Sequence, residues 1–219
     1  MPNHRTSTVL LLPALVIAGT CTGIASAQII DFRDTGQALG GDNDSYSVAL
    51  GDLDGDGDLD AMIANSGANT VWTNDGTGTF TDSGQTLGGS ASSSVALGDL
   101  DGDGDTDAIF ANSGSNTVWI NDGTGTFSYG QGLGNNFSNS VALGDLDGDG
   151  DLDAVFANSE NKQSNTAWIN DGNGTFTESG QALGNGPSSS IALGDLDLDG
   201  DLDAFIANAA NQSNTVWLN

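Results

Sequence analysis

The segment GDLDGDGDLDA, residues 51–61, places five aspartates within nine residues. Nearly the same letters return at residues 98–108, 144–154 and 194–204, so this acidic loop occurs four times. None of the four segments contains a lysine or an arginine. Four carboxylates about 6 Å apart repel one another by on the order of 4 kcal/mol in water. A folded loop of this composition therefore calls for a bound cation.

The spacing of the carboxylates within each loop predicts a calcium site. Counted from Asp52, side-chain carboxylates fall at positions 1, 3, 5 and 9, with Gly57 at position 6 and Asp58 at position 7. An EF-hand loop uses side chains at 1, 3 and 5, a backbone carbonyl at 7 and a glycine at 6. Position 12 is Ile63 instead of glutamate, so the loop resembles EF-hand and dockerin loops but lies in a β-hairpin. An all-oxygen, flexible ligand set favours calcium over magnesium.

The same spacing in all four copies gives one predicted calcium ion per copy, about four in total. The aspartates at position 7 are expected to contribute their backbone only. Leu198 replaces glycine at position 4 of the fourth loop, a place where the side chain should matter little, so the fourth site is kept. The predicted metal residues are Asp52, Asp54, Asp56, Asp58, Asp60, Asp99, Asp101, Asp103, Asp105, Asp107, Asp145, Asp147, Asp149, Asp151, Asp153, Asp195, Asp197, Asp199, Asp201 and Asp203.

The acidic loop belongs to a longer internal repeat. Val48, Val95, Val141 and Ile191 begin matching segments that are spaced 47, 46 and 50 residues apart. Each repeat contains four short apolar or alternating runs separated by Gly, Asn and Asp turns, and no run has the length or period of an amphipathic helix. Each repeat is therefore predicted to be a four-stranded antiparallel meander, and four meanders must stack to bury their faces.

The two ends of the chain predict how the stack is organised. Residues 29–41 match the fourth strand at residues 78–89, whereas the last repeat stops after its third strand at residues 214–219. The sequence thus predicts an all-β fold, a four-bladed β-propeller of four-stranded antiparallel blades, closed by the N-terminal strand completing the last blade. Closure avoids an unpaired sheet edge. The alternative is a pair of chains that forms a larger ring, so the chain is expected to be a monomer or a homodimer.

These motifs carry a family resemblance. GDLDGDGDLDA followed by NTVWTNDGTGTF, residues 69–80, resembles the FG-GAP/VCBS repeat, which also builds the propellers of integrin α-subunits. The resemblance covers residues 28–219, and it implies a β-propeller with one calcium ion in the hairpin loop of each blade. The matching positions are the first, third, fifth and ninth aspartates of each loop. Integrin propellers have seven blades, and this chain supplies four.

Composition and the first residues indicate export. The chain has 219 residues, 30 Asp+Glu against 3 Lys+Arg and a formal net charge of -27, which disfavours nucleic acid and anionic membranes as partners. Residues 1–27 have a basic start, a short apolar stretch and the small-residue cleavage site ASA, so they are expected to be a cleaved signal peptide with no membrane span. Residues 28–219 then lack cysteine and histidine. The location is expected to be secreted, either extracellular or periplasmic.

Without His or Cys in residues 28–219, Ser-His and Cys-His catalysis is excluded, and the chain is expected not to be an enzyme. A glycan-active carboxylate pair is a minor alternative. The favoured function is a binding or adhesion module for an extracellular glycan or protein. Its candidate surface is formed by residues 40–47, 88–94, 134–140 and 184–190, whose only aromatics are Tyr46 and Phe137. The main alternative is a structural surface scaffold without a small ligand. The four tryptophans are expected to pack between blades.

Overall fold

The computed structural model describes residues 31–40, 43–160 and 163–219. Its contacts divide the chain into two units, Met1–Thr35 and Gly36–Asn219, and each is described here by itself. Residues 31–35 form neither helix nor strand. Within them, Arg33 donates to the carboxylate of Asp31 at 2.9 Å on the surface. The predicted signal peptide, residues 1–27, lies outside the described residues.

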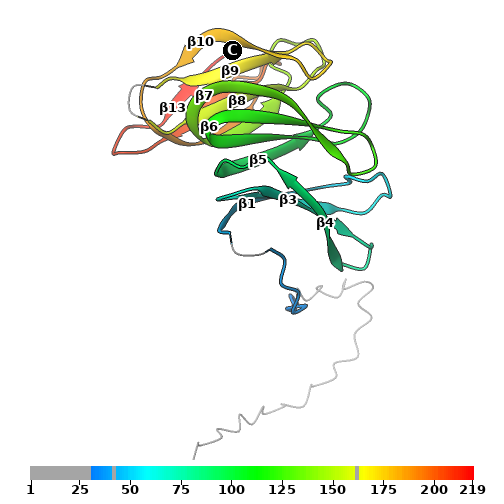
Figure 1. Ribbon diagram of the computed structural model, residues 1–219. Coiled ribbons are helices and arrows are strands. Elements are labelled where there is room, and N and C mark those ends of the chain that lie inside the picture. The colour runs from blue at the N-terminus through cyan, green and yellow to red at the C-terminus, as the bar shows by residue number, and fades with distance from the viewer. Residues whose placement is uncertain (1–30, 41–42, 161–162) are drawn as a thin grey trace, which may run out of the picture. The chain divides into compact units, whose positions relative to one another are not determined.

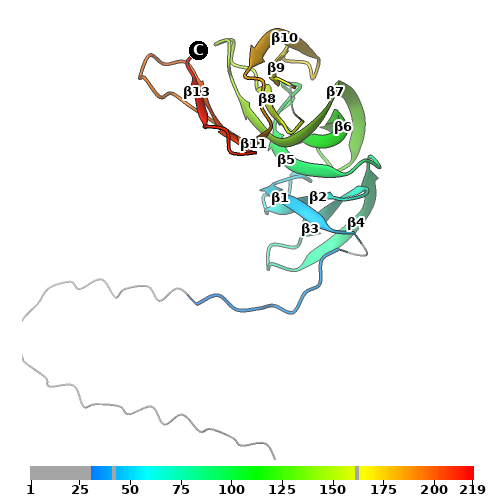
Figure 2. The same ribbon diagram turned by 90° about the vertical axis from the view of Figure 1, so that its left-hand side faces the viewer.

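The second unit is built of β-strands only over the described residues, and all strand pairs are antiparallel (Figures 1 and 2). The first sheet has the order β1-β2-β3-β4, with strands β1 (Ser45–Gly51), β2 (Asp60–Asn65), β3 (Asn69–Asn74) and β4 (Phe80–Leu87). The last sheet has the order β11-β12-β13, with strands β11 (Ser188–Gly194), β12 (Asp203–Asn208) and β13 (Thr215–Trp217). Both are simple meanders, as the repeat pattern predicts.

Between these two lies a six-stranded sheet of order β10-β9-β8-β7-β6-β5. Its strands are β5 (Ser92–Gly98), β6 (Asp107–Asn121), β7 (Phe127–Gly144), β8 (Asp153–Asn158), β9 (Asn165–Asn170) and β10 (Phe176–Leu183). We refer to residues 45–87, 92–133, 138–183 and 188–217 as repeats one to four. Strand β7 runs from repeat two into repeat three and thereby joins their sheets.

The joining of repeats two and three has a local cause. The connection between them has one glycine, Gly134, and no proline, whereas the other two connections have a second glycine, Gly89 or Gly186, and the last also has Pro187. A chain without a second glycine or a proline at this point stays extended, so Asn136 pairs with Gly114 in the β6–β7 ladder. The prediction of four separate blades is therefore wrong for the described residues, which form three sheets.

The predicted closure of the ring is also wrong for the described residues. Residues 31–40 form no strand, and the last sheet has three strands with β13 at its edge. The side chain of Gln37 instead donates to the carbonyl of Gly78 at 2.7 Å and accepts from the amide of Phe80 at 2.8 Å. The segment that was expected to complete the last sheet is thus bound, through Gln37, to the first one.

The register of the first two strands of each repeat fixes the position of the acidic loop. Gly51 pairs with Asp60, and the same Gly–Asp pair closes the hairpin in every later repeat. Each acidic loop is therefore the turn of a β-hairpin, and its ninth residue is the first residue of the second strand.

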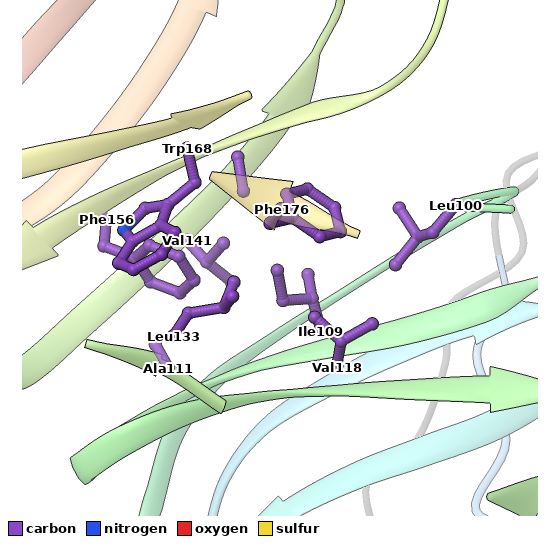
Figure 3. Packing of buried hydrophobic residues seen from close by; sticks show 10 residues of the cluster. Leu100, Ile109, Ala111, Val118, Leu133, Val141, Phe156, Trp168 and Phe176 are labelled. Atoms are coloured by element: carbon purple, nitrogen blue, oxygen red, sulfur yellow. The ribbon is translucent and has the colours of Figure 1, made fainter. Parts of the chain in front are cut away.

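The hydrophobic core lies between successive repeats, in three clusters. In the cluster of Figure 3, the Phe176 ring from β10 lies between Leu100 on one side and Val141 and Trp168 on the other. Leu100 belongs to the acidic loop of repeat two and Phe176 to repeat three, so folding of the loop and stacking of the repeats depend on each other. Burial of one such aromatic ring stabilises the stack by about 2–3 kcal/mol.

Three of the four tryptophans contact these clusters, as predicted from their place in apolar strands, whereas Trp72 of repeat one does not. Trp168 is part of one cluster, and Trp119 and Trp217 pack against the others. Each tryptophan donates its indole N–H to the threonine two residues earlier, for example Trp119 to Thr117 at 3.1 Å. Each ring is thus oriented by its own strand, and those of Trp119, Trp168 and Trp217 also pack in the clusters between repeats.

Candidate metal centre

The first aspartate of each acidic loop shapes the turn. The Asp52 carboxylate accepts hydrogen bonds from the amides of Gly55 at 2.8 Å and Gly57 at 3.0 Å. Both glycines have positive φ, 78° and 92°, which side chains resist. Asp99 and Asp145 make the same pair of bonds in repeats two and three.

The fourth loop folds in the same way despite its leucine. Asp195 accepts from the amides of Leu198 at 2.6 Å and Gly200 at 3.2 Å. Leu198 has a φ of 67°, which costs a non-glycine residue roughly 1–2 kcal/mol. Its side chain is exposed and is not part of the acidic group.

The ninth aspartate joins the loop to the rest of its repeat. Asp107 is fully buried, and its two oxygens accept from the amides of Leu100 at 2.8 Å and Asn121 at 2.7 Å. Asp60, Asp153 and Asp203 hold the equivalent amides of their own repeats. Each carboxylate oxygen has two lone pairs, so one remains available for a cation after these bonds.

Three carboxylates converge in every loop. In each group, ligand atoms from the three residues lie within 4.8 Å of one another. In the first three loops the groups combine positions 1, 3 and 9, and in the fourth they combine positions 1, 3 and 5. The groups are Asp52, Asp54 and Asp60; Asp99, Asp101 and Asp107; Asp145, Asp147 and Asp153; and Asp195, Asp197 and Asp199. Of the predicted side-chain ligands, Asp56, Asp103, Asp149 and Asp203 lie outside these groups.

The seventh aspartate lies against a different turn. A Cβ at Gly76, Gly123 or Gly172 would meet the carboxylate of Asp58, Asp105 or Asp151, respectively. These glycines belong to the NDG turns between the third and fourth strands and have positive φ of 73–77°. The sequence shows these turns but gives no indication that an acidic loop packs on them.

The electrostatics of the groups fit a cation. Burial raises the pKa of Asp107 to about 6, against the opposing effect of its two backbone hydrogen bonds. Burial likewise raises the pKa of Asp54, Asp101 and Asp153, and neighbouring carboxylates add to each shift. In repeat four, hydrogen bonds from the backbone of Asn219 and Leu196 lower the pKa of Asp203. Within the described ranges the one salt bridge is Arg33–Asp31, so no basic side chain neutralises the groups.

A second set of contacts, which sequence reasoning missed, couples each loop to the next repeat. Asn121 of repeat two donates to the carbonyl of Leu53 in the first loop at 2.8 Å, and Asn170 donates to that of Leu100 at 2.8 Å. Asn219 makes the equivalent bond to Leu146. The signal available in the sequence is the Asn that recurs at the end of the third strand of each repeat. Through these bonds, a cation that orders one loop also supports the following repeat.

The variable segments lie at the opposite end of the first strands. Each leads into β1, β5, the second half of β7 or β11, whereas the acidic loops follow the ends of the same strands. Tyr46 and Phe137 are both exposed. Asn139 donates to the carbonyl of Ser188 at 2.9 Å, which links two neighbouring segments. Residues 41 and 42 of the first segment lie outside the described residues.

Comparison with protein families gives a match over most of the chain. A family model described as an FG-GAP-like repeat matches three overlapping stretches, residues 52–110, 99–156 and 145–206. Together they span residues 52–206, and each stretch runs from one acidic loop into the next repeat. No curated protein matches the chain.

Part of the chain is similar to three solved structures from different settings. A lectin of Agrocybe aegerita that recognises non-reducing terminal N-acetylglucosamine is 24% identical, with a TM-score of 0.46, over 72% of this chain and 45% of its own. The V. cholerae biofilm matrix protein Bap1 is 20% identical, with a TM-score of 0.48, over 74% of this chain and 24% of its own. The Tc holotoxin pore of Photorhabdus luminescens is 22% identical, with a TM-score of 0.44, over 78% of this chain and 9% of its own. The chain thus spans less than half the length of each.

Proposed function

Because the chain belongs to the family of FG-GAP-like repeat proteins, we propose that it is a secreted, calcium-binding module of propeller type. Its calcium ions are mainly structural, and its variable segments bind an extracellular glycan or protein. The observation that carries the proposal is the convergence of three carboxylates in each of four hairpins, without a basic side chain near them in the described ranges.

The structural role of calcium follows from where the groups lie. A bound calcium ion would supply the positive charge that the loops lack. The first, third and ninth aspartates of repeats one to three would hold it, and Asp195, Asp197 and Asp199 would do so in repeat four. The ninth aspartates are buried at the start of the second strand, so ordering the loop also orders the hairpin. Each site would stabilise the fold by about 2.7 kcal/mol at a hundredfold excess of calcium over its Kd.

The proposed ligand surface is the end of the first strands opposite the acidic loops. It combines polar segments that differ between repeats with the exposed rings of Tyr46 and Phe137. An exposed aromatic ring next to hydroxyl and amide groups suits the apolar face and the hydroxyls of a sugar. No catalytic role is proposed.

Secretion rests on the signal-peptide pattern of residues 1–27. Within the described ranges, no helix has the length and the apolar character needed to cross a membrane.

Two experiments test the proposal. Calorimetric titration of the chelator-treated protein should show calcium binding at about four sites per chain, and a titration without heat would refute the calcium assignment. A glycan array probed in millimolar calcium and again in chelator should show signals that Tyr46→Ala or Phe137→Ala weakens. A blank array, together with intact calcium binding, would favour the surface scaffold instead.

A further inference from the structure

Successive repeats are joined by the same contact. The ring of Phe127 at the start of β7, or of Phe176 at the start of β10, is buried against the preceding repeat. A glutamine of that preceding repeat holds the phenylalanine backbone. Gln131 accepts from the amide of Phe176 at 2.8 Å and donates to its carbonyl at 2.9 Å, and Gln85 accepts from the amide of Phe127 at 2.9 Å. We call this pair of a buried ring and a glutamine the joint.

Between repeats three and four the joint is incomplete. The third core cluster contains Leu183, Ile191 and Ile206, with Trp217 packed against it, but no phenylalanine. Gln181, which corresponds to Gln131, has no side-chain hydrogen bond to any described residue. In place of the ring there is a cavity of about 170 Å³, lined by Leu146, Val155, Leu183, Leu202, Trp217 and Gln181. An apolar protein cavity of about 150 Å³ accommodates a benzene ring.

The outer faces of the first and last repeats show what is missing around this cavity. Val216 in β13 is 52% exposed, whereas its equivalent Val71 in β3 is fully buried. At the other end, Val48 in β1 is 61% exposed, whereas its equivalent Val95 is 8% exposed. Within the described residues, no fourth strand covers β13 and no preceding repeat covers β1.

Phe32 is a phenylalanine of this repeat position that lacks a joint within the described residues. Phe32 matches Phe127 and Phe176 in the repeat alignment, and its side chain is 95% exposed. Gln37, five residues later, is already bound to Gly78 and Phe80 of repeat one, as Gln85 and Gln131 are bound in their joints. The segment therefore has the sequence of a fourth strand, and its glutamine already occupies its joint.

We propose that the cavity of the last repeat receives Phe32 of a second copy of this chain, whose neighbouring residues pair with β13. Phe32 of the same chain could enter only if the last repeat lay against repeat one, where Gln37 is bound. The exposure of Val48 and of Leu50 in β1 shows that it does not. A second copy fills the cavity, pairs the open edge of β13 and covers both exposed apolar faces at once.

Two copies can satisfy this contact reciprocally. Each contact joins a cavity on one copy to a segment on the other, so two copies related by a two-fold axis make the contact twice and leave neither surface open. Two chains of four repeats give eight, which is within the usual range of four to eight units in a propeller. The length of β13, three residues against six in β3 and β9, is consistent with a strand that lacks its outer neighbour.

The test is the mass of the purified chain in solution in millimolar calcium, measured by light scattering after size exclusion. The parent is expected at the mass of two chains, and Phe32→Ala at the mass of one chain at the same concentration. Because Phe32 is exposed in the single chain, this change leaves folding intact. Phe137→Ala, which removes an exposed ring elsewhere, is the matched control and should stay at two chains. Gln181→Ala should raise the dimer dissociation constant by about a hundredfold, because two hydrogen bonds are lost at each of the two joints.

Two results would overturn the proposal. A parent chain at the mass of one chain up to high concentration would show that no second copy fills the cavity. A two-chain mass that Phe32→Ala leaves unchanged would show that the copies meet through another surface. Neither result bears on calcium binding, which the calorimetric titration with calcium measures separately.

Discussion

Replacement of the buried aspartate of the second loop separates the metal role of that residue from its role in folding. Asp107→Asn keeps the size and shape of the side chain but replaces one carboxylate oxygen by an NH₂ group. Only one of the amides of Leu100 and Asn121 then keeps its acceptor. Leaving one buried amide without a partner costs about 1–3 kcal/mol. The change also removes a desolvated charge. A rise of the Asp107 pKa from 3.8 to about 6 corresponds to about 3 kcal/mol of destabilisation by the ionised form at pH 7.

In chelator these two effects have opposite signs and similar size, so Asp107→Asn should leave the melting temperature nearly unchanged. In calcium the variant also loses one member of the group with Asp99 and Asp101. The loss of one site costs about 2.7 kcal/mol at a hundredfold excess of calcium over Kd. At about 2–4 °C per kcal/mol for a chain of this size, the melting temperature should fall by roughly 5–11 °C in calcium.

The assay is thermal unfolding followed by circular dichroism, with parent and variant each measured at pH 7 in millimolar calcium and in chelator. Glu178→Gln is the matched control. It removes one negative charge from an exposed position of β10 whose side chain has no hydrogen bond within the described ranges. The control should change little in either buffer. Equal shifts of Asp107→Asn in calcium and in chelator would refute the assignment of this aspartate as a metal ligand.

Three further outcomes are expected. In chelator the melting temperature should rise as the pH falls from 7 to 5, because burial raises the pKa of Asp107 to about 6 and the folded state therefore binds more protons than the unfolded state over this range. In calcium the melting temperature should fall instead, since protons compete with calcium for the ligands, and a chelator profile that falls would contradict the burial of this charge. Gly123→Ala should lower the free energy of unfolding in urea by about 2 kcal/mol more than Gly84→Ala does. Both glycines have positive φ, but only at Gly123 would the new methyl group press against a carboxylate, that of Asp105. Equal losses for the two variants would contradict that contact. Gln131→Ala should destabilise by about 2–3 kcal/mol in the same assay, because it leaves the backbone amide and carbonyl of Phe176 without partners; a change under about 0.5 kcal/mol would show that the joint contributes little.

The position of the candidate site could be predicted from the sequence because it depends on local chemistry. An aspartate that accepts from the amides of two glycines three and five residues later, both at positive φ, sets the turn within one short segment. The alternation of apolar residues on either side sets two strands and their pairing. The choice among carboxylates could not be predicted, because the burial of Asp60 against Asn74, which lies 14 residues away, depends on the third strand of the repeat.

The sequence by itself therefore determined the repeat, the antiparallel hairpins, the acidic loops and the family, since each depends on residues close together in the chain. Only the tertiary structure decided how the repeats are joined and where the stack stays open. Asn136, in the connection to repeat three, pairs with Gly114 of repeat two. Asn121 and Gln131 bridge neighbouring repeats, and a cavity remains beside Trp217. These contacts link residues that are 22 to 71 positions apart. Their energies depend on how whole sheets pack, which a short stretch of sequence does not encode.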